Sequence, residues 1–216
     1  MTVADMNQTV AELSSRLQTA AHGGIEVTAQ TPSPKSYCAS TKSDFLASKT
    51  CGSSIMISSR LLGRRELVDI SSAKLRNYLQ QILTPATPGS GSMALFGLQG
   101  GHGTASTPEE RQGSVHPAWR RAYAHFMTYC APVNATVNAE IALMTGADWY
   151  EEHIEPVWKE WTGPDGGSYA NEGNVFSSTW KEDFYGLVKN YKRLERIKRT
   201  QRLIRRARCL FGCRGE

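Results

Sequence analysis

Residues 167–197 read GSYANEGNVFSSTWKEDFYGLVKNYKRLERI, an ordering of aromatic, amide and apolar residues that helix formation alone does not require. Polar groups come first, at Tyr169, Asn171 and Glu172. The elements that follow are Trp180, Phe184-Tyr185-Gly186, Asn190-Tyr191, Arg193-Leu194 and Ile197-Lys198. We therefore expect a polar segment that leads into a C-terminal helical segment.

A second motif lies upstream, where residues 116–120 read HPAWR. Together the two motifs resemble the C-terminal portion of berberine bridge enzyme-like FAD-linked oxidoreductases, within the vanillyl-alcohol oxidase/PCMH-type superfamily. Members of that family typically show Asn/His-Pro-Ala-Trp-Arg, then Tyr-x-Asn-Glu, a Trp, Phe-Tyr-Gly, and Asn-Tyr followed by Arg-Leu and Ile-Lys. The resemblance covers most of residues 40–198.

The resemblance implies an α+β fold in which an antiparallel sheet flanked by helices forms the substrate-binding domain, with a C-terminal helical segment after it. We expect residues 1–165 to belong to that domain, 166–198 to form the berberine-like segment, and 199–216 to be an atypical basic tail. Family members also have a large FAD-binding domain, of which we find no counterpart, because no glycine-rich fingerprint follows a strand here. Residues 100–103, GGHG, are expected to form a surface turn instead.

Periodicity predicts the elements of the body. Residues 53–59 and 93–98 favour strands, the second of them in the centre of the sheet. A helix is expected after a capping serine at position 71 or 72 and before Pro85, because apolar residues recur there at helical spacing, namely Leu75, Tyr78, Leu79 and Ile82. Residues 134–144 and 147–161 favour two further helices.

Residues 119–130 favour a longer strand with two different faces. One face is small and apolar, from Ala122 to Cys130, and is expected to pack in the core. The other face carries Tyr123 and His125 and can line a pocket. Strands and helices in this order predict a sheet covered on one side.

Residues 1–23 are expected to form an amphipathic helix, with Thr2 and Asp5 as its cap and Val10, Leu13 and Leu17 on one face. The segment has neither the early basic region nor the apolar core of a secretory signal, so the sequence leaves the location of the protein open. The apolar runs are too short to span a membrane.

The net charge of +5 belongs to the end of the chain, since residues 198–216 hold seven basic residues against one acidic residue. The rest of the chain is nearly neutral, and we expect no nucleic-acid partner. After Lys198 the family pattern is lost, which we interpret as a shifted frame or an alternative exon end, with a solvated basic helix as the other interpretation. Five scattered cysteines predict neither a disulfide framework nor a metal site.

The chemistry implied by the resemblance is oxidation of an alcohol, sugar, amine or activated carbon by hydride transfer to FAD, with oxygen as the usual acceptor. Tyr169 and Asn171 are expected beside the flavin. Tyr169 and Glu172 are the catalytic candidates, and Glu172 either accepts the substrate proton or anchors its loop by accepting backbone hydrogen bonds. Tyr123 and His125 are the substrate-binding candidates, or else half-buried side chains with a structural role.

Three functions are consistent with these residues. The chain can be the substrate-side portion of an FAD-linked oxidoreductase, inactive alone and acting on a small-molecule substrate with an FAD-binding domain as its partner. It can be one half of a working enzyme that a separately encoded FAD domain completes. It can also be a non-enzymatic module that binds a ligand or a macromolecule.

Overall fold

The computed structural model describes residues 2–20, 22, 26–29, 55–99, 101–134, 136–186 and 188–200. The chain divides into two compact units, Met1–Gly52 and Ser53–Glu216. The boundaries that we expected from the sequence, after residues 165 and 198, are not tested by this division and stay predictions. Of the predicted basic tail, residues 201–216 lie outside the described residues.

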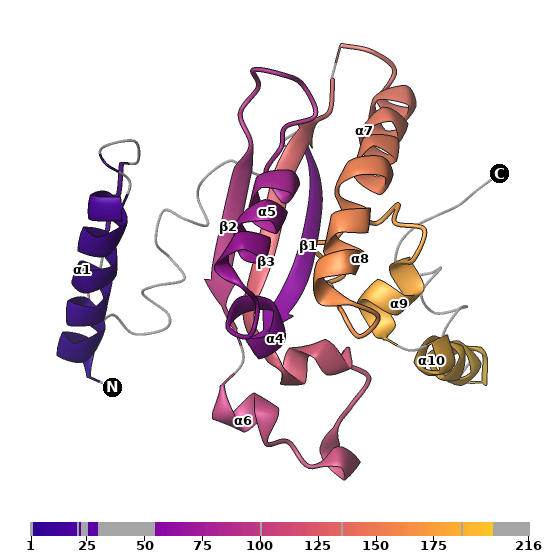
Figure 1. Ribbon diagram of the computed structural model, residues 1–216. Helices are drawn as coiled ribbons and strands as arrows, with labels where there is room; N and C mark the ends of the chain where they lie inside the picture. Colours follow the sequence, from indigo (N-terminus) through magenta and orange to yellow (C-terminus); the bar gives the residue numbers. More distant parts are fainter. Residues whose placement is uncertain are drawn as a thin grey trace, which may run out of the picture. The chain divides into compact units, whose positions relative to one another are not determined.

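The first unit contains helix α1 (Val3–Ala20), labelled in Figure 1. Thr2 and Asp5 form the predicted cap: the Thr2 hydroxyl accepts from the Asp5 amide at 3.2 Å, and the Asp5 carboxylate accepts from the Thr2 amide at 2.6 Å. Leu13 and Leu17 are exposed on this helix. The helical prediction for the N-terminal segment is confirmed.

The second unit is built on a three-stranded antiparallel sheet of β1 (Ile55–Gly63), β2 (Met93–Leu98) and β3 (Ala122–Pro132), in the order β1-β3-β2. The α+β prediction is therefore confirmed. The prediction of a central strand at 93–98 is wrong in its position, because β3 pairs with both neighbours and β2 lies at the edge. Its uninterrupted apolar run, MALFGL, is what made it look central.

Both other strands begin or end differently from the prediction. β1 continues past Ser59 to Gly63 because buried Arg60 is neutralised within the fold and Leu61 and Leu62 are buried as well. β3 begins at Ala122 instead of 119 because a 3₁₀ turn, η2 (Pro117–Arg120), precedes it. Proline at the start of that turn lacks an N–H for a sheet hydrogen bond.

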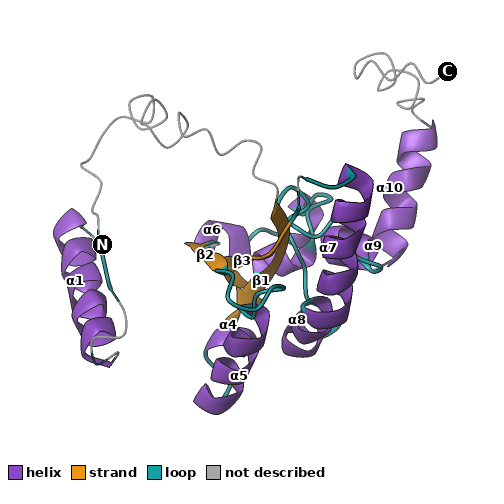
Figure 2. Cartoon of the chain, turned by 90° about the horizontal axis from the view of Figure 1, so that it is seen from above, coloured by secondary structure: helices purple, strands orange, loops and turns teal. Residues whose placement is uncertain are grey.

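Three helices cover one face of the sheet: α5 (Ser72–Ile82), α7 (Ala139–His153) and α8 (Glu155–Thr162) (Figure 2). The Ser71 cap of α5 is confirmed, since its hydroxyl accepts from the Lys74 amide. The predicted break between α7 and α8 is wrong, because it falls at Ile154, before Pro156, and not at residues 145–146. Gly146 stays inside α7, where a Cβ atom would lie 2.9 Å from the Met56 Cγ atom.

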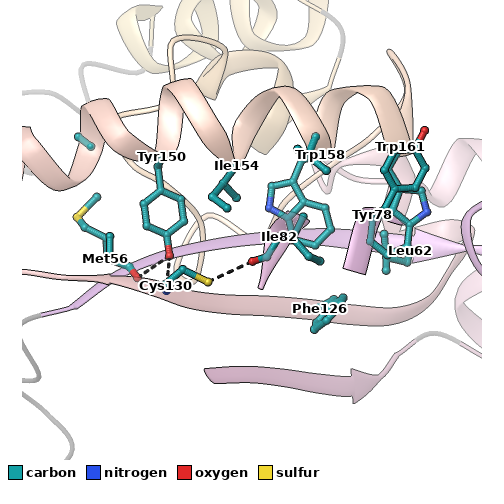
Figure 3. Packing of buried hydrophobic residues seen from close by; sticks show 13 residues of the cluster. Met56, Leu62, Tyr78, Ile82, Phe126, Cys130, Tyr150, Ile154, Trp158 and Trp161 are labelled. Carbon is teal, nitrogen blue, oxygen red and sulfur yellow. Dashed lines mark hydrogen bonds between the residues drawn. The ribbon is translucent and has the colours of Figure 1, made fainter. Parts of the chain in front are cut away.

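The main core lies between these helices and the sheet. Figure 3 shows Tyr150, Ile154, Trp158 and Trp161 pointing from α7 and α8 toward the strands. The Tyr150 hydroxyl is buried, and it accepts from the Cys130 amide at 3.0 Å. Burial is the main cause that raises the pKa of the Cys130 thiol, to about 11. This packing confirms the predicted small, apolar face of the third strand.

A buried ionic cluster joins three elements of this unit. The Arg60 guanidinium on β1 contacts the Glu155 carboxylate of α8 at 2.7 Å and the Asp183 carboxylate at 3.3 Å. Asp183 belongs to α9 (Trp180–Tyr185), and it also accepts from the Ser177 hydroxyl at 2.9 Å. The cluster therefore links the C-terminal segment to the sheet.

The remaining elements are short or peripheral. They are α4 (Arg64–Leu67), α6 (His102–Ala105), η1 (Glu109–Arg111) and α10 (Val188–Thr200). The turn expected at 100–103 includes the start of α6, a single helical turn. In the described part of the chain no helix has the length and apolarity to cross a membrane, and no group of three or more His, Cys, Asp or Glu side chains could hold a metal ion.

Candidate functional site

The polar segment at 167–172 runs beside β1 and is fixed there by backbone and hydroxyl contacts. The Leu61 amide donates to the Gly167 carbonyl at 2.8 Å, and the Ser59 and Ser168 hydroxyls lie 2.8 Å apart. The Ser168 amide donates to the Asp183 carbonyl at 2.7 Å, so the same serine is tied to α9. Because Ser168 is almost fully buried, the residues that follow it start from a defined position.

His116 of the HPAWR motif holds this segment from the other side. Its Nδ1 atom accepts from the Ala118 amide at 2.9 Å, and its Nε2 atom lies 3.0 Å from the Glu182 carbonyl oxygen, to which it donates as Nε2–H. Burial lowers the pKa of this imidazole, so the neutral form is favoured. Glycine is needed at position 167, because a Cβ atom there would lie 2.5 Å from His116 Nδ1. His116 thus caps the turn that begins at Pro117.

The face of the sheet opposite the helices is called here the open face. On β3 it carries Tyr123, His125, Met127 and Tyr129, in alternation with the core residues. On edge strand β2 the same face carries Leu95, which is exposed, opposite Met127. Apolar and aromatic side chains thus remain accessible on this face.

The segment after Ser168 brings three predicted site residues to one end of the open face. The Glu172 carboxylate lies 3.3 Å from His125 Nδ1, and the Tyr169 ring stands edge-on to the imidazole with centroids 5.9 Å apart. The Asn171 amide donates to the Tyr169 hydroxyl at 2.7 Å. Trp119 completes the group, 5.6 Å from Tyr169 between ring centroids. The pair of His125 and Glu172 is a dyad, and the group around it is called here the dyad cluster. Its five residues are Trp119, His125, Tyr169, Asn171 and Glu172.

Protonation in the dyad cluster follows from its geometry. His125 is 3% exposed, and burial lowers its pKa, while the nearby Glu172 carboxylate opposes that shift. In the neutral imidazole, Nδ1–H can donate to Glu172, which leaves Nε2 as the acceptor. Nε2 is buried and has no hydrogen-bond partner within the described residues. An unpaired buried acceptor costs stability, and this one belongs to the imidazole that contacts Glu172 and Tyr169.

Glu172 itself is accessible, with a side chain that is 41% exposed. The described residues contain no backbone amide that donates to its carboxylate, so the contact with His125 is its main one. Its charge also reaches Tyr129, whose pKa is raised first by burial and then by Glu172. The accessible carboxylate thus faces the open face next to a neutral imidazole.

Tyr123 lies apart from the dyad cluster in its contacts, although it shares the open face of β3 with His125. It lines a cavity of about 880 Å³ together with residues of α4, α6 and η2, and four arginines contribute to the lining of that cavity, Arg64, Arg65, Arg120 and Arg121.

From the sequence, we named neither Trp119 as a wall of the dyad cluster nor these arginines as a group. The available signals were the tryptophan of the HPAWR motif and two Arg-Arg pairs.

No family model matches this sequence, and no curated protein matches it. A solved structure with a similar fold is that of the VAO-type flavoprotein MtVAO713 from Myceliophthora thermophila C1, with a TM-score of 0.54 and 23% sequence identity. The match covers 65% of this chain and 23% of that chain. The matched 65% of this chain thus has the fold of a portion of a VAO-type flavoprotein, and it spans less than a quarter of that protein's length.

Proposed function

We propose that this chain is the substrate-side portion of an FAD-linked oxidoreductase, of the berberine bridge enzyme-like kind. The observation that carries the proposal is that Tyr169, Asn171 and Glu172, which the motif resemblance singles out, meet His125 at one end of the open face of a sheet with the fold of a VAO-type flavoprotein portion. The FAD-binding part would be a further domain or a separate chain. Oxygen is the proposed final acceptor.

The residues of the dyad cluster fit the substrate-facing side of a flavin. Among the residues that the structure describes, the buried Nε2 atom of His125 has no hydrogen-bond partner, and the exposed Asn171 uses its amide nitrogen, not its oxygen, to contact Tyr169. Tyr169 and Asn171 would hold the ring system of the cofactor, through stacking and hydrogen bonding respectively. A bound flavin supplies the two-electron acceptor that side chains cannot provide.

The chain's own residues would bind the substrate and move its proton. Glu172 is the proposed proton acceptor, because its carboxylate is accessible and makes its closest polar contact with an uncharged imidazole. His125 would orient that carboxylate through Nδ1–H, and Tyr169 can donate its hydroxyl proton while its oxygen accepts from Asn171. Tyr123 would contact the substrate farther along the same face of β3.

The test uses the protein as its own cells make it. After purification, its visible spectrum is recorded before and after anaerobic addition of sugars, aromatic alcohols and alkaloid amines. The proposal requires flavin absorbance that at least one of these compounds bleaches. A colourless natural protein, isolated together with every chain that stays bound to it, would refute the oxidoreductase proposal and leave a non-enzymatic binding module.

The role of Glu172 is tested on the same material. Glu172→Gln keeps the size of the side chain and removes its basicity, so we expect bleaching to slow by about 10²–10⁴-fold, the usual effect of losing a general base. Glu152→Gln is the matched control, because Glu152 is exposed on α7. Equal bleaching rates in the two variants would assign Glu172 a structural role.

A further inference from the structure

The cavity beside Tyr123 is a separate feature of the open face. Its walls come from the end of β1 with α4, the end of β2, α6, and the junction of η2 with β3. A volume of about 880 Å³ lies within the range of small-molecule sites, about 300–1,000 Å³. Apolar contact comes from Leu98, Ala105 and Tyr123.

The charged lining of this cavity is unbalanced, with four arginines against Glu66 and Asp69. Both carboxylates already contact an arginine that is close in the sequence. Glu66 accepts from the Gly63 amide at 2.9 Å and from Arg65 Nε at 2.7 Å, and Asp69 lies 3.2 Å from Arg64 Nε. Arg64 and Arg65 are therefore neutralised by near neighbours in the chain.

Arg120 and Arg121, by contrast, have only neutral partners within the described residues. Arg120 donates to the Thr104 carbonyl at 3.4 Å and to the Thr107 hydroxyl at 3.2 Å, and Arg121 donates to the Asp165 carbonyl at 2.8 Å. All three acceptors are neutral. In the described part of the chain, no carboxylate lies within salt-bridge distance of either guanidinium.

Holding the half-buried Arg120 with neutral partners fixes its position without cancelling its charge. A guanidinium presents a planar set of donors that matches a carboxylate in a bidentate contact. We propose that this cavity binds an organic carboxylate through Arg120 and Arg121, with Tyr123 contacting the body of the ligand. This inference deepens the proposed function, on which it rests, by naming the substrate class as organic acids.

The first experiment measures binding to the full 216-residue chain by calorimetry, with no flavin present. Two matched pairs of probes are used: benzoate with benzamide, and glucuronate with glucose. In at least one pair we expect the acid to bind about tenfold more tightly than its neutral partner. Binding of the acid should weaken with added salt because the contact is ionic. Inorganic phosphate is a further probe, and it should bind less tightly than the acid that binds best.

The second experiment removes the charges one at a time. Arg120→Gln and Arg121→Gln should each reduce carboxylate affinity by about tenfold, whereas Arg76→Gln on the exposed side of α5 should not change it. Urea unfolding of each variant shows whether it keeps the fold. If Arg120→Gln unfolds because Thr104 and Thr107 lose their contacts, Arg121→Gln and the salt dependence still decide the question.

The inference would be overturned by no binding of either acid, by equal binding of acids and neutral partners, or by affinity that the cavity variants leave unchanged. Tighter binding of phosphate than of both acids would also overturn the carboxylate assignment. The flavin proposal has a different readout. If the chain binds an acid at Arg120 while its natural form, isolated with every bound chain, is colourless, the proposed oxidoreductase is refuted and the carboxylate site is kept.

Discussion

Replacing Arg60 by methionine removes the cation that the described residues place in the buried cluster and keeps a flexible apolar side chain in its place. Glu155, at 0% side-chain exposure, loses its 2.7 Å contact, and Asp183, at 9%, loses its 3.3 Å contact. Removing one partner of a buried ion pair costs about 3–5 kcal/mol, because the remaining charge stays desolvated. A domain of ordinary stability unfolds at a cost of about 5–15 kcal/mol, so the loss is a large share of the total.

The assay for Arg60→Met is equilibrium urea unfolding followed by tryptophan fluorescence, since Trp158 is fully buried beside β3. Arg76→Met is the control, because Arg76 is exposed on α5 and its replacement should change the unfolding free energy by no more than about 0.5 kcal/mol. A triple variant, Arg60→Met with Glu155→Gln and Asp183→Asn, should lose less than Arg60→Met alone, because no charge stays unpaired. A loss below about 1 kcal/mol in the single variant, or a larger loss in the triple variant, would refute the reasoning.

Further predictions concern buried groups. Tyr150→Phe should lower the unfolding free energy by about 1–3 kcal/mol, because the Cys130 amide and Met56 carbonyl lose their partner; an unchanged urea midpoint would contradict this. Cys130, with its pKa raised to about 11, should react with iodoacetamide at neutral pH only after denaturation, as mass spectrometry of its peptide can show. Burial lowers the pKa of His116 and His125 below the unfolded value of about 6.5, so the unfolded state binds protons first and stability should fall as pH drops from about 7.5 to 5.5. Urea midpoints across this range should show the fall, and His116→Gln should reduce it; a flat profile contradicts the assignment.

Features that depend on neighbouring residues were predictable from the sequence. The Ser71 cap and the apolar spacing of α5 lie within one helix, and the two faces of β3 follow from simple alternation. Features that depend on distant partners were not. A charged residue such as Arg60 suggests that a buried strand ends there. The strand continues because Glu155, 95 residues away, neutralises Arg60, and the sequence does not reveal that contact. The place of β2 at the edge likewise depends on which strands pair, and its composition does not reveal that.

The candidate site shows the same limit. Tyr169, Asn171, Glu172 and His125 could each be singled out from motifs or alternation, but their meeting depends on the contact of Ser59 with Ser168, 109 residues apart. Alternation placed Tyr123 on the same face as His125, and the structure puts Tyr123 in the wall of a separate cavity. The charge of that cavity comes from two Arg-Arg pairs that the fold brings together.

Residues 166–186 are attached to β1 and η2 by an ion pair, hydroxyl contacts and backbone hydrogen bonds, and none of their buried side chains belongs to the main core. Exchange of this segment would therefore leave the main core unchanged, provided that Asp183 and Ser168 keep their contacts with Arg60 and Ser59. His125 would stay in the sheet, whereas its acidic partner Glu172 would be replaced by the residue at that position of the new segment. A different side chain could then be placed beside His125 by grafting one short stretch of chain.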